Sequence, residues 1–221
     1  MRYVVTGKPS DGPIARYINR PISTRITRLI IRITDKVTPN QITVIAFALG
    51  IFSGLAYLIS SPIIAGILVQ FSSIFDGVDG EIARALHKES KFGAFVDSIL
   101  DRLVDGCVLI CISIYLLRTS SINIEILMLV ALLALLGNVL VSYVRGKMEQ
   151  FFGEAMKQVK QTNIATRDVR LFLIFLGSVL GYIFETLVLL VILTYLQVII
   201  KMVKSCKIYN EFYRKENKNG H

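Results

Sequence analysis

Apolar residues are grouped into long runs that are separated by short polar and basic segments. Each run is close to the length of about 20 residues that a membrane-spanning helix needs. Four of them cover residues 42–59, 62–86, 92–117 and 124–144. The last apolar tract, 171–203, is too long for one span, so we predict two helices that part near Gly181–Glu185, with Gly177 and Gly181 as packing positions. The pattern therefore predicts six transmembrane helices.

The start of the first predicted span has a clear local signal. Thr38 is a suitable N-cap, Pro39 fits the first helical position, and Gln41 is placed to close a capping box. Farther along this span, Gly50 and Gly54 lie on one helix face and would allow a neighbouring helix to approach closely.

Residues 12–35 have a different pattern, in which isoleucine and leucine side chains form one helical stripe. Arg25, Arg28 and Arg32 fall largely on the other side. The segment is too charged to span a bilayer, and we predict an amphipathic helix that starts at Pro21 and lies in the membrane interface. A solvated helix of an additional domain is the alternative.

Composition agrees with a membrane protein. The 221 residues are 53% hydrophobic, and their mean hydropathy of +0.60 is unusual for a soluble domain. We predict an all-α, polytopic integral membrane protein in three parts. They are a cytoplasmic or interfacial segment (1–37), a six-helix transmembrane domain (38–205) and a cytoplasmic tail (206–221).

The net charge of +9 indicates orientation. Of the 25 Lys and Arg residues, 23 lie in 1–40, 84–91, 145–170 and 201–221, which six spans would bring to one side. By the positive-inside rule this side is cytoplasmic and holds both termini. Because these residues border apolar runs, anionic headgroups explain them better than nucleic acid does. We expect the plasma membrane of a prokaryote, and a homodimer is compatible with the sequence.

Four acids interrupt this apolar background: Asp76, Asp79, Asp97 and Asp101. Charges in membrane segments are costly and usually functional. Asp76 and Asp79 share a face of one predicted helix, Asp97 and Asp101 a face of the next, and the polar stretch 85–92 would form the loop between them. The pairs then lie at similar depth, and we predict that all four carboxylates converge and bind a hard divalent cation.

The same stretch has the form D-x2-D-G-x2-A-R-x8-G-x3-D-x3-D, which resembles the signature of the CDP-alcohol phosphotransferase (phosphatidyltransferase) family. Its fixed positions are Asp76, Asp79, Gly80, Ala83, Arg84, Gly93, Asp97 and Asp101. The resemblance implies a membrane enzyme of phospholipid or polyol phosphodiester synthesis. It would transfer a substituted phosphate from a CDP-alcohol to an acceptor alcohol and release CMP. The four aspartates would hold two Mg²⁺ or Mn²⁺ ions, and Asp101 would also be the base.

The resemblance also implies a set of contacts to the CDP-alcohol: Asn40, Thr43, Gly80, Ala83, Arg84, Ser90 and Gly93. Asn40 and Thr43 lie at a helix N-terminus, where free N–H groups and the helix dipole favour a diphosphate. The glycines would let a nucleotide approach the backbone, although ordinary helix packing also explains them. Arg84 suits a phosphate or a lipid headgroup.

Arg167 and Arg170 are the candidates for the acceptor site, since they lie one turn apart at the start of the fifth span and arginine binds phosphate bidentately. They resemble the basic pair of members whose acceptor is a phosphorylated polyol such as inositol phosphate. The opening segment 6–27 is similar to that of archaeal di-inositol-phosphate synthases. Asp105 could pair with Arg102 or belong to the acceptor pocket, and Glu81 suits an arginine or a basic headgroup.

Two other classes of protein place acids within membrane helices. A cation transporter explains the aspartates but not the pattern of Gly80, Ala83, Arg84 and Gly93. An intramembrane prenyltransferase uses Asp-rich motifs with Mg²⁺, but these usually lie on well-separated segments of a larger bundle. The transporter is the principal alternative.

Overall fold

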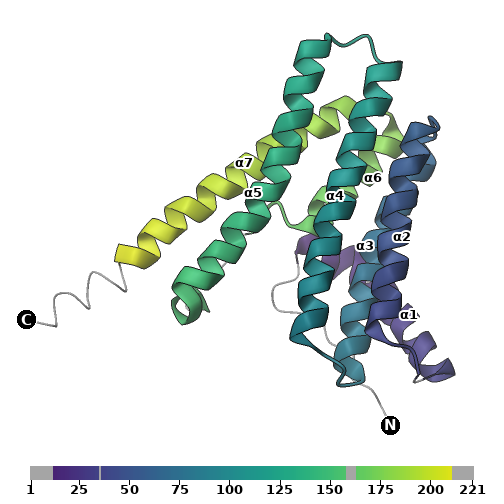
Figure 1. The fold of residues 1–221 in the computed structure, drawn as a ribbon, viewed down its shortest axis with the longest axis vertical. Helices are drawn as coiled ribbons and strands as arrows, with labels where there is room; N and C mark the ends of the chain where they lie inside the picture. The colour runs from purple at the N-terminus through teal and green to yellow at the C-terminus, as the bar shows by residue number, and fades with distance from the viewer. Residues whose placement is uncertain (1–11, 35, 158–162, 211–221) are drawn as a thin grey trace, which may run out of the picture.

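The computed structural model describes residues 12–34, 36–157 and 163–210, with only the backbone for 154–157. All regular elements in these residues are helices, as predicted (Figure 1). Their order is η1 (Ala15–Asn19), α1 (Arg20–Ile33), α2 (Pro39–Leu58), α3 (Pro62–Ala85), α4 (Lys91–Thr119), α5 (Ile124–Lys157), α6 (Arg167–Leu180) and α7 (Ile183–Ile208). The start of the predicted N-terminal segment and most of the predicted tail lie outside the described residues.

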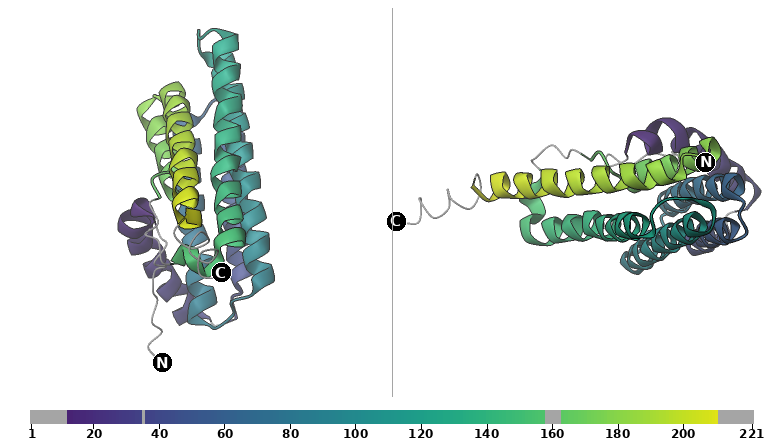
Figure 2. Two further views of the ribbon diagram at one scale, coloured as in Figure 1. Left: turned by 90° about the vertical axis from the view of Figure 1, so that its left-hand side faces the viewer. Right: turned by 90° about the horizontal axis from the view of Figure 1, so that it is seen from above.

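Helices α2 to α7 form an elongated bundle (Figure 1). The turns that join α2 to α3, α4 to α5 and α6 to α7 lie toward one end, whereas the connection from α3 to α4 lies at the other. In Figure 1 and in the view from above in Figure 2, α5 and α7 run side by side away from the other helices. By length and composition, four of the described helices are candidates to cross a membrane: α2, α3, α5 and α7.

The predicted start of α2 is confirmed. Thr38 is the N-cap of a helix that begins at Pro39, and the backbone N–H of Thr38 donates to Oε1 of Gln41 at 3.0 Å, as in a capping box. Gly50 and Gly54 form the expected packing face. A side chain at Gly50 would collide with Val104 of α4, and one at Gly54 would lie 3.1 Å from the sulfur of Cys107. The absence of side chains therefore lets α4 pack tightly on α2.

The long apolar tract divides where the sequence predicts. Helix α6 ends at Leu180, and Gly181 has the left-handed φ of +82° that glycine adopts without strain at a helix C-terminus. Gly177 lies against Thr186 and the backbone of Tyr182, so it allows the turn to close. Helix α6 has only 14 residues, about 21 Å, and is shorter than a complete span.

Two helix boundaries differ from the prediction. The predicted fourth span ends at Val144, but α5 continues to Lys157 with one non-helical residue, Gly153. Strong helix formers such as Arg145, Lys147 and Glu149 extend the helix beyond its apolar part. The N-terminal helix starts before Pro21, because residues 13–33 are helical without a break. Pro21 is the ninth residue of this run and cannot donate a backbone hydrogen bond, and the residues just before it, Ala15–Asn19, are π-helical rather than α-helical.

The N-terminal helix, defined here as η1 and α1 together, packs on α3 through polar contacts. Ser23 and Thr27 are fully buried, while Leu29 and Ile33 are exposed. The buried side chains surround Glu81 of α3, whose carboxylate accepts from Ser23 Oγ at 2.7 Å and Thr27 Oγ1 at 2.8 Å. Arg20 Nη1 lies 2.8 Å from Glu81 Oε1. Glu81 therefore pairs with an arginine, which was one of its two predicted roles.

The apolar core lies between helices α2 to α7. Its largest fully buried side chains include Tyr57, Ile112, Leu171 and Leu187. The hydroxyl of Tyr57 is hydrogen-bonded to Ser178, which joins α2 to α6 inside the core. Since this core occupies the part of the bundle beyond the acidic residues, it holds the helices that carry them in a defined arrangement.

Candidate active site

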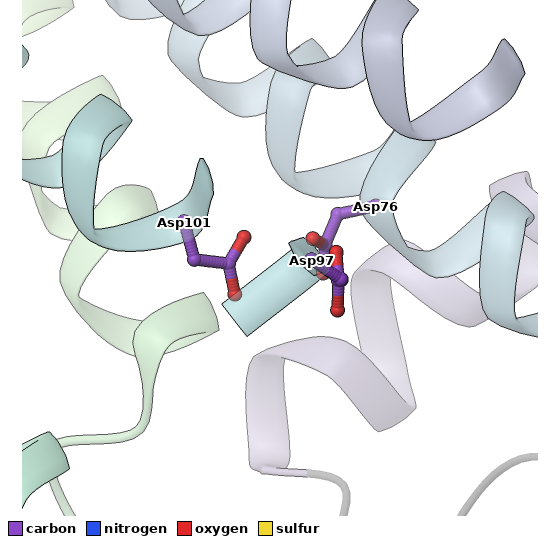
Figure 3. A group of neighbouring side chains, drawn as sticks. All are labelled: Asp76, Asp97 and Asp101. Atoms are coloured by element: carbon purple, nitrogen blue, oxygen red, sulfur yellow. The ribbon is translucent and has the colours of Figure 1, made fainter. Parts of the chain in front are cut away.

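The centre of the site is formed by Asp76 of α3 with Asp97 and Asp101 of α4. Each offers a carboxylate oxygen, and these three oxygens all lie within 4.8 Å of one another. Figure 3 shows the carboxylates of Asp76 and Asp97 side by side, facing the same space as that of Asp101. Three like charges at this separation repel one another and favour a bound cation. Carboxylate oxygens are the ligands that Mg²⁺, Mn²⁺ and Ca²⁺ prefer, so the donor set fits a hard divalent ion.

Asp79 lies beside this group rather than within it. Its side chain is buried, and its Oδ2 accepts from Thr43 Oγ1 of α2 at 2.6 Å. Residues three apart on a helix point about 60° away from each other. Asp76 therefore faces α4 and α6, while Asp79 faces α2. Of the four carboxylates predicted to converge, the structure places three in one cluster. The fourth, that of Asp79, is hydrogen-bonded to Thr43, which the sequence predicted to contact the CDP-alcohol.

Arg167, predicted to bind the acceptor, lies directly against the aspartates. Its Nη1 is 3.0 Å from Asp76 Oδ1 and 2.9 Å from Asp101 Oδ1, and its Nε is 3.1 Å from Asp105 Oδ1. The guanidinium thus joins α6 to both acid-bearing helices. The pattern of the sequence did not predict this contact, since Arg167 is 91 residues after Asp76 in the chain.

Asp105 connects the two predicted acceptor arginines. One oxygen contacts Arg167, and the other lies 3.6 Å from Arg170 Nη2. Arg170 is buried and also donates to the backbone oxygen of Asn138 at 3.5 Å. Of the two predicted roles of Asp105, the structure favours the one beside the acceptor arginines. Arg102 instead pairs with Asp101, at 3.3 Å.

A cavity next to these arginines contains two polar residues that sequence reasoning missed, Asn138 and Thr194. Asp105, Asn138, Arg170 and Thr194 line it together with leucine, isoleucine and alanine side chains from α4 to α7. Asn138 Nδ2 lies 3.5 Å from Asp105 Oδ2. The available signal was Asn138 itself, an isolated amide within the apolar run of α5. Polar groups in such runs usually face the interior of the bundle.

The residues predicted to contact the donor lie around the start of α4 and the end of α3. Ser90 is the N-cap of α4, and its Oγ accepts from the backbone N–H of Gly93 at 2.9 Å. A side chain at Gly93 would lie 3.8 Å from Oδ1 of Asn40, so these three residues are neighbours. Gly80, Ala83 and Arg84 are partly exposed on α3. Ser90 therefore has a structural role as a cap in addition to the predicted contact.

Comparison with known proteins finds similar sequences over most of the chain. A family model described as CDP-alcohol phosphatidyltransferase matches residues 36–203. The bifunctional IPC transferase and DIPP synthase of Thermococcus kodakarensis is 50% identical over 169 residues, which are 74% of this chain and 36% of that protein. The archaetidylinositol phosphate synthase of Pyrococcus horikoshii is 32% identical over 172 residues, which are 77% of this chain and 85% of that protein.

The fold also has a close experimental counterpart. The crystal structure of phosphatidylinositol phosphate synthase of Mycobacterium tuberculosis, with CDP-DAG bound, superposes with a TM-score of 0.67 at 18% identity. The alignment covers 86% of this chain and 94% of that chain. The chain spans only about a third of the length of the bifunctional relatives in Thermococcus kodakarensis and Archaeoglobus fulgidus, 36% and 33%.

Proposed function

The chain belongs to the CDP-alcohol phosphatidyltransferase family, and from this premise we propose that it transfers a substituted phosphate group from a CDP-alcohol to an acceptor alcohol and releases CMP. The observation that carries the proposal is the cluster of Asp76, Asp97 and Asp101, whose oxygens lie within 4.8 Å of one another. A cation transporter would also need intramembrane acids, but it would need neither the matched family pattern nor an arginine held at the cluster.

The acids are proposed to hold two divalent cations, Mg²⁺ or Mn²⁺, with Asp79 as the fourth ligand. Its carboxylate lies on the same helix as Asp76 and is held by Thr43. Bound there, the ions would neutralise phosphate charge and stabilise the oxygens of an in-line displacement. The protein's part is to fix the carboxylates on α3 and α4, two helices that both pack on α2, so that little reorganisation is needed when the substrates bind.

Asp101 is proposed to be the general base. It would accept the proton of the acceptor hydroxyl as that oxygen forms a bond to the β-phosphorus, while the bond from this phosphorus to the oxygen of CMP breaks. Its contact with Arg167 at 2.9 Å supports this role, because it places the base next to a residue proposed to bind the acceptor.

The donor is proposed to occupy the space beside the start of α4 and the end of α3. Asn40, Thr43, Ser90 and Gly93 would lie toward its diphosphate and nucleotide, as would three residues of α3: Gly80, Ala83 and Arg84. The proximity of Asn40, Ser90 and Gly93 supports this assignment. The match with a fold that binds CDP-DAG supports it independently.

The acceptor is proposed to be a phosphorylated polyol such as inositol phosphate, bound by Arg167 and Arg170. The two guanidinium groups are presented from one face of α6 and share the counter-ion Asp105. The names of the Pyrococcus horikoshii and Mycobacterium tuberculosis proteins both refer to inositol phosphate products, which supports this acceptor class.

In the membrane, α2 to α7 are proposed to be six spans, with the N-terminal helix at the cytoplasmic interface of a prokaryotic plasma membrane. The distribution of basic residues supports this orientation. Helix α6 starts at the depth of the aspartates, since Arg167 contacts them, and its 14 residues are then sufficient to reach the far side. A homodimer also belongs to this proposal, and the mass of the protein in detergent tests it.

The function is tested with purified protein, radiolabelled CDP-alcohols and a panel of polyols with and without phosphate, with CMP release as the measurement. We expect CMP release that depends on Mg²⁺ or Mn²⁺ and on the acceptor. Cation flux in proteoliposomes without any binding of CDP-alcohols would favour the transporter instead.

The acceptor class is tested with Arg167→Ala. Because arginine binds phosphate through two parallel hydrogen bonds, we expect the KM for inositol phosphate to rise about 100-fold. The KM for the CDP-alcohol should change much less. Arg145→Ala, on the exposed extension of α5, is the matched control. An unchanged acceptor KM in Arg167→Ala would remove this residue from the acceptor site.

A further inference from the structure

The N-terminal helix contacts both of the helices that face each other across the site. At its start, the backbone N–H of Ala15 donates to Oδ2 of Asp168 at 2.6 Å. Asp168 is the second residue of α6 and directly follows Arg167. A carboxylate at the first turn of a helix is favourably placed for hydrogen bonds and for the helix dipole. The same acid thus tethers the N-terminal helix to the segment that presents Arg167.

This tether is also tightly packed. Gly12 is buried, and a side chain at this position would collide with Thr166 Oγ1 and lie 2.6 Å from both oxygens of Asp168. Thr166 is the N-cap residue of α6. Gly12 therefore packs against the two residues that flank Arg167 in the chain, Thr166 and Asp168. This packing requires a residue without a side chain at position 12.

Farther along, the N-terminal helix is fixed to α3. Asn19 Nδ2 donates to Ser73 Oγ at 3.0 Å, and Gln70 Nε2 donates to Asn19 Oδ1 at 2.8 Å. Arg20 Nη1 donates to Gly77 O at 3.3 Å and to Glu81 Oε1 at 2.8 Å. The residues contacted on α3 recur every three or four positions and form one stripe. Asp79, two residues before Glu81, points to roughly the opposite side of α3.

Helices α3 and α6 also pack directly on each other. Near the C-terminal end of α6, Gly66 packs against Ser178 and the backbone of Phe175. Near its start, Arg167 contacts Asp76 at 3.0 Å. If Arg167 exchanges Asp76 for the phosphate of an acceptor, as the proposed function requires, the ion pair between α3 and the start of α6 is lost. The N-terminal helix would then still hold the start of α6 at a defined distance from the aspartates.

We propose that the N-terminal helix acts as a brace, holding the start of α6 at a fixed position relative to α3. Asp168, with Gly12 packed against it, is the positioning residue that keeps Arg167 where it can bind the acceptor. This inference rests on the proposed acceptor role of Arg167. Neither Gly12 nor Asp168 touches the reacting groups in this account. They act through the placement of α6, so changes there should affect the acceptor and leave the donor and metal sites intact.

The experiment compares Asp168→Ala and Gly12→Ala with the matched control Gly146→Ala, in which the added methyl group meets no atom within 4 Å. In full-length protein we expect the KM for inositol phosphate to rise about tenfold in both test variants. The KM for the CDP-alcohol and the Kd for Mn²⁺, the latter measured by paramagnetic resonance, should stay within about twofold. The control should match the wild type in all three quantities.

Asp168→Asn separates positioning from a general loss of structure. The amide keeps an oxygen that can accept from Ala15 but loses the negative charge, so the acceptor KM should rise about threefold, less than in Asp168→Ala. This isosteric variant also decides the outcome if the alanine variant does not fold. An unchanged acceptor KM in Asp168→Asn and Gly12→Ala would overturn the brace, and so would equal losses toward donor and acceptor.

Failure of the proposed function would look different. In that case Arg167→Ala itself would leave the acceptor KM unchanged, or the wild type would not release CMP. If Arg167→Ala has its expected effect while the Gly12 and Asp168 variants behave like the control, the acceptor site stands and only the brace is wrong.

Discussion

The two sides of α3 both carry acids, yet they differ in what surrounds them. On one side, the carboxylate of Glu81 is fully buried and accepts from Arg20, Ser23 and Thr27 of the N-terminal helix. On the other side, Asp76 is about one-third exposed and lies within 4.8 Å of two further carboxylates. The first acid is satisfied by groups of the protein. The second belongs to a cluster of like charges, which is the arrangement expected of a cation site.

This difference shows why acidity within a membrane segment is insufficient to identify a catalytic residue. Asp79 and Glu81 are two positions apart, and both are buried. Their roles follow from which helix each side chain meets, α2 for Asp79 and the N-terminal helix for Glu81. A charged group in a low-dielectric environment must be paired or must bind a ligand, and the neighbours decide which of these occurs.

The strongest test of the clustered side is Asp101→Asn. An amide cannot accept the proton of the acceptor hydroxyl, so we expect the transfer rate to fall about 1,000-fold. CMP binding should remain measurable, because the other aspartates are intact. Glu89→Gln, in the exposed loop before α4, is the control. More than a tenth of the wild-type rate in Asp101→Asn would exclude this residue as the base.

The satisfied side is tested by Glu81→Ala, for which we expect a loss of stability. Removing the carboxylate abolishes the ion pair with Arg20 and the acceptor of two buried hydroxyl groups, which should cost about 3 kcal/mol and lower Tm by roughly 10 °C. Thermal unfolding in detergent measures the change. The control is Glu149→Ala, which removes an exposed ion pair with Arg145 and should shift Tm very little. Equal shifts in the two variants would contradict the structural role of Glu81.

Thr43→Val makes a finer distinction, because it changes the environment of Asp79 without removing a carboxylate. The variant loses the hydrogen bond of 2.6 Å from Thr43 to Asp79. We expect the Kd for Mn²⁺ and the KM for the CDP-alcohol each to rise about fivefold. Thr119→Val is the matched control, since that exposed hydroxyl donates only to the backbone of its own helix in the described structure. No change in either constant would separate Asp79 from the metal and donor sites.

Much of the fold follows from local sequence. The capping box at Thr38, the end of α3 near Leu86 and the division at Gly181 were all predictable, because each depends on residues next to one another in the chain. The part of α5 after Val144 was not predictable in this way, because hydropathy shows where the apolar run ends and not where the helix ends. The start of the N-terminal helix was also missed, because proline is typical of a helix start, whereas Pro21 lies in the interior of a longer helix that is π-helical just before it.

The aspartate cluster was largely predictable for the same reason, as two adjacent helices joined by a short loop must bring their facing side chains together. Asp105 and Arg167 were less predictable. The sequence left two roles open for Asp105 and named no protein partner for Arg167. Which residues they contact depends on the packing of α6 on α3 and on the reach of the Arg167 side chain to α4.

The sequence alone determined the helices, the family pattern and the acids that can bind cations, because these depend on local periodicity and on chemistry within a short stretch. The tertiary structure decided which acids are satisfied and which are clustered. It also decided that Arg167 faces the aspartates and that the N-terminal helix joins α3 to α6. These are contacts between residues distant in the chain, and their geometry is set by how whole helices pack, which no local pattern encodes.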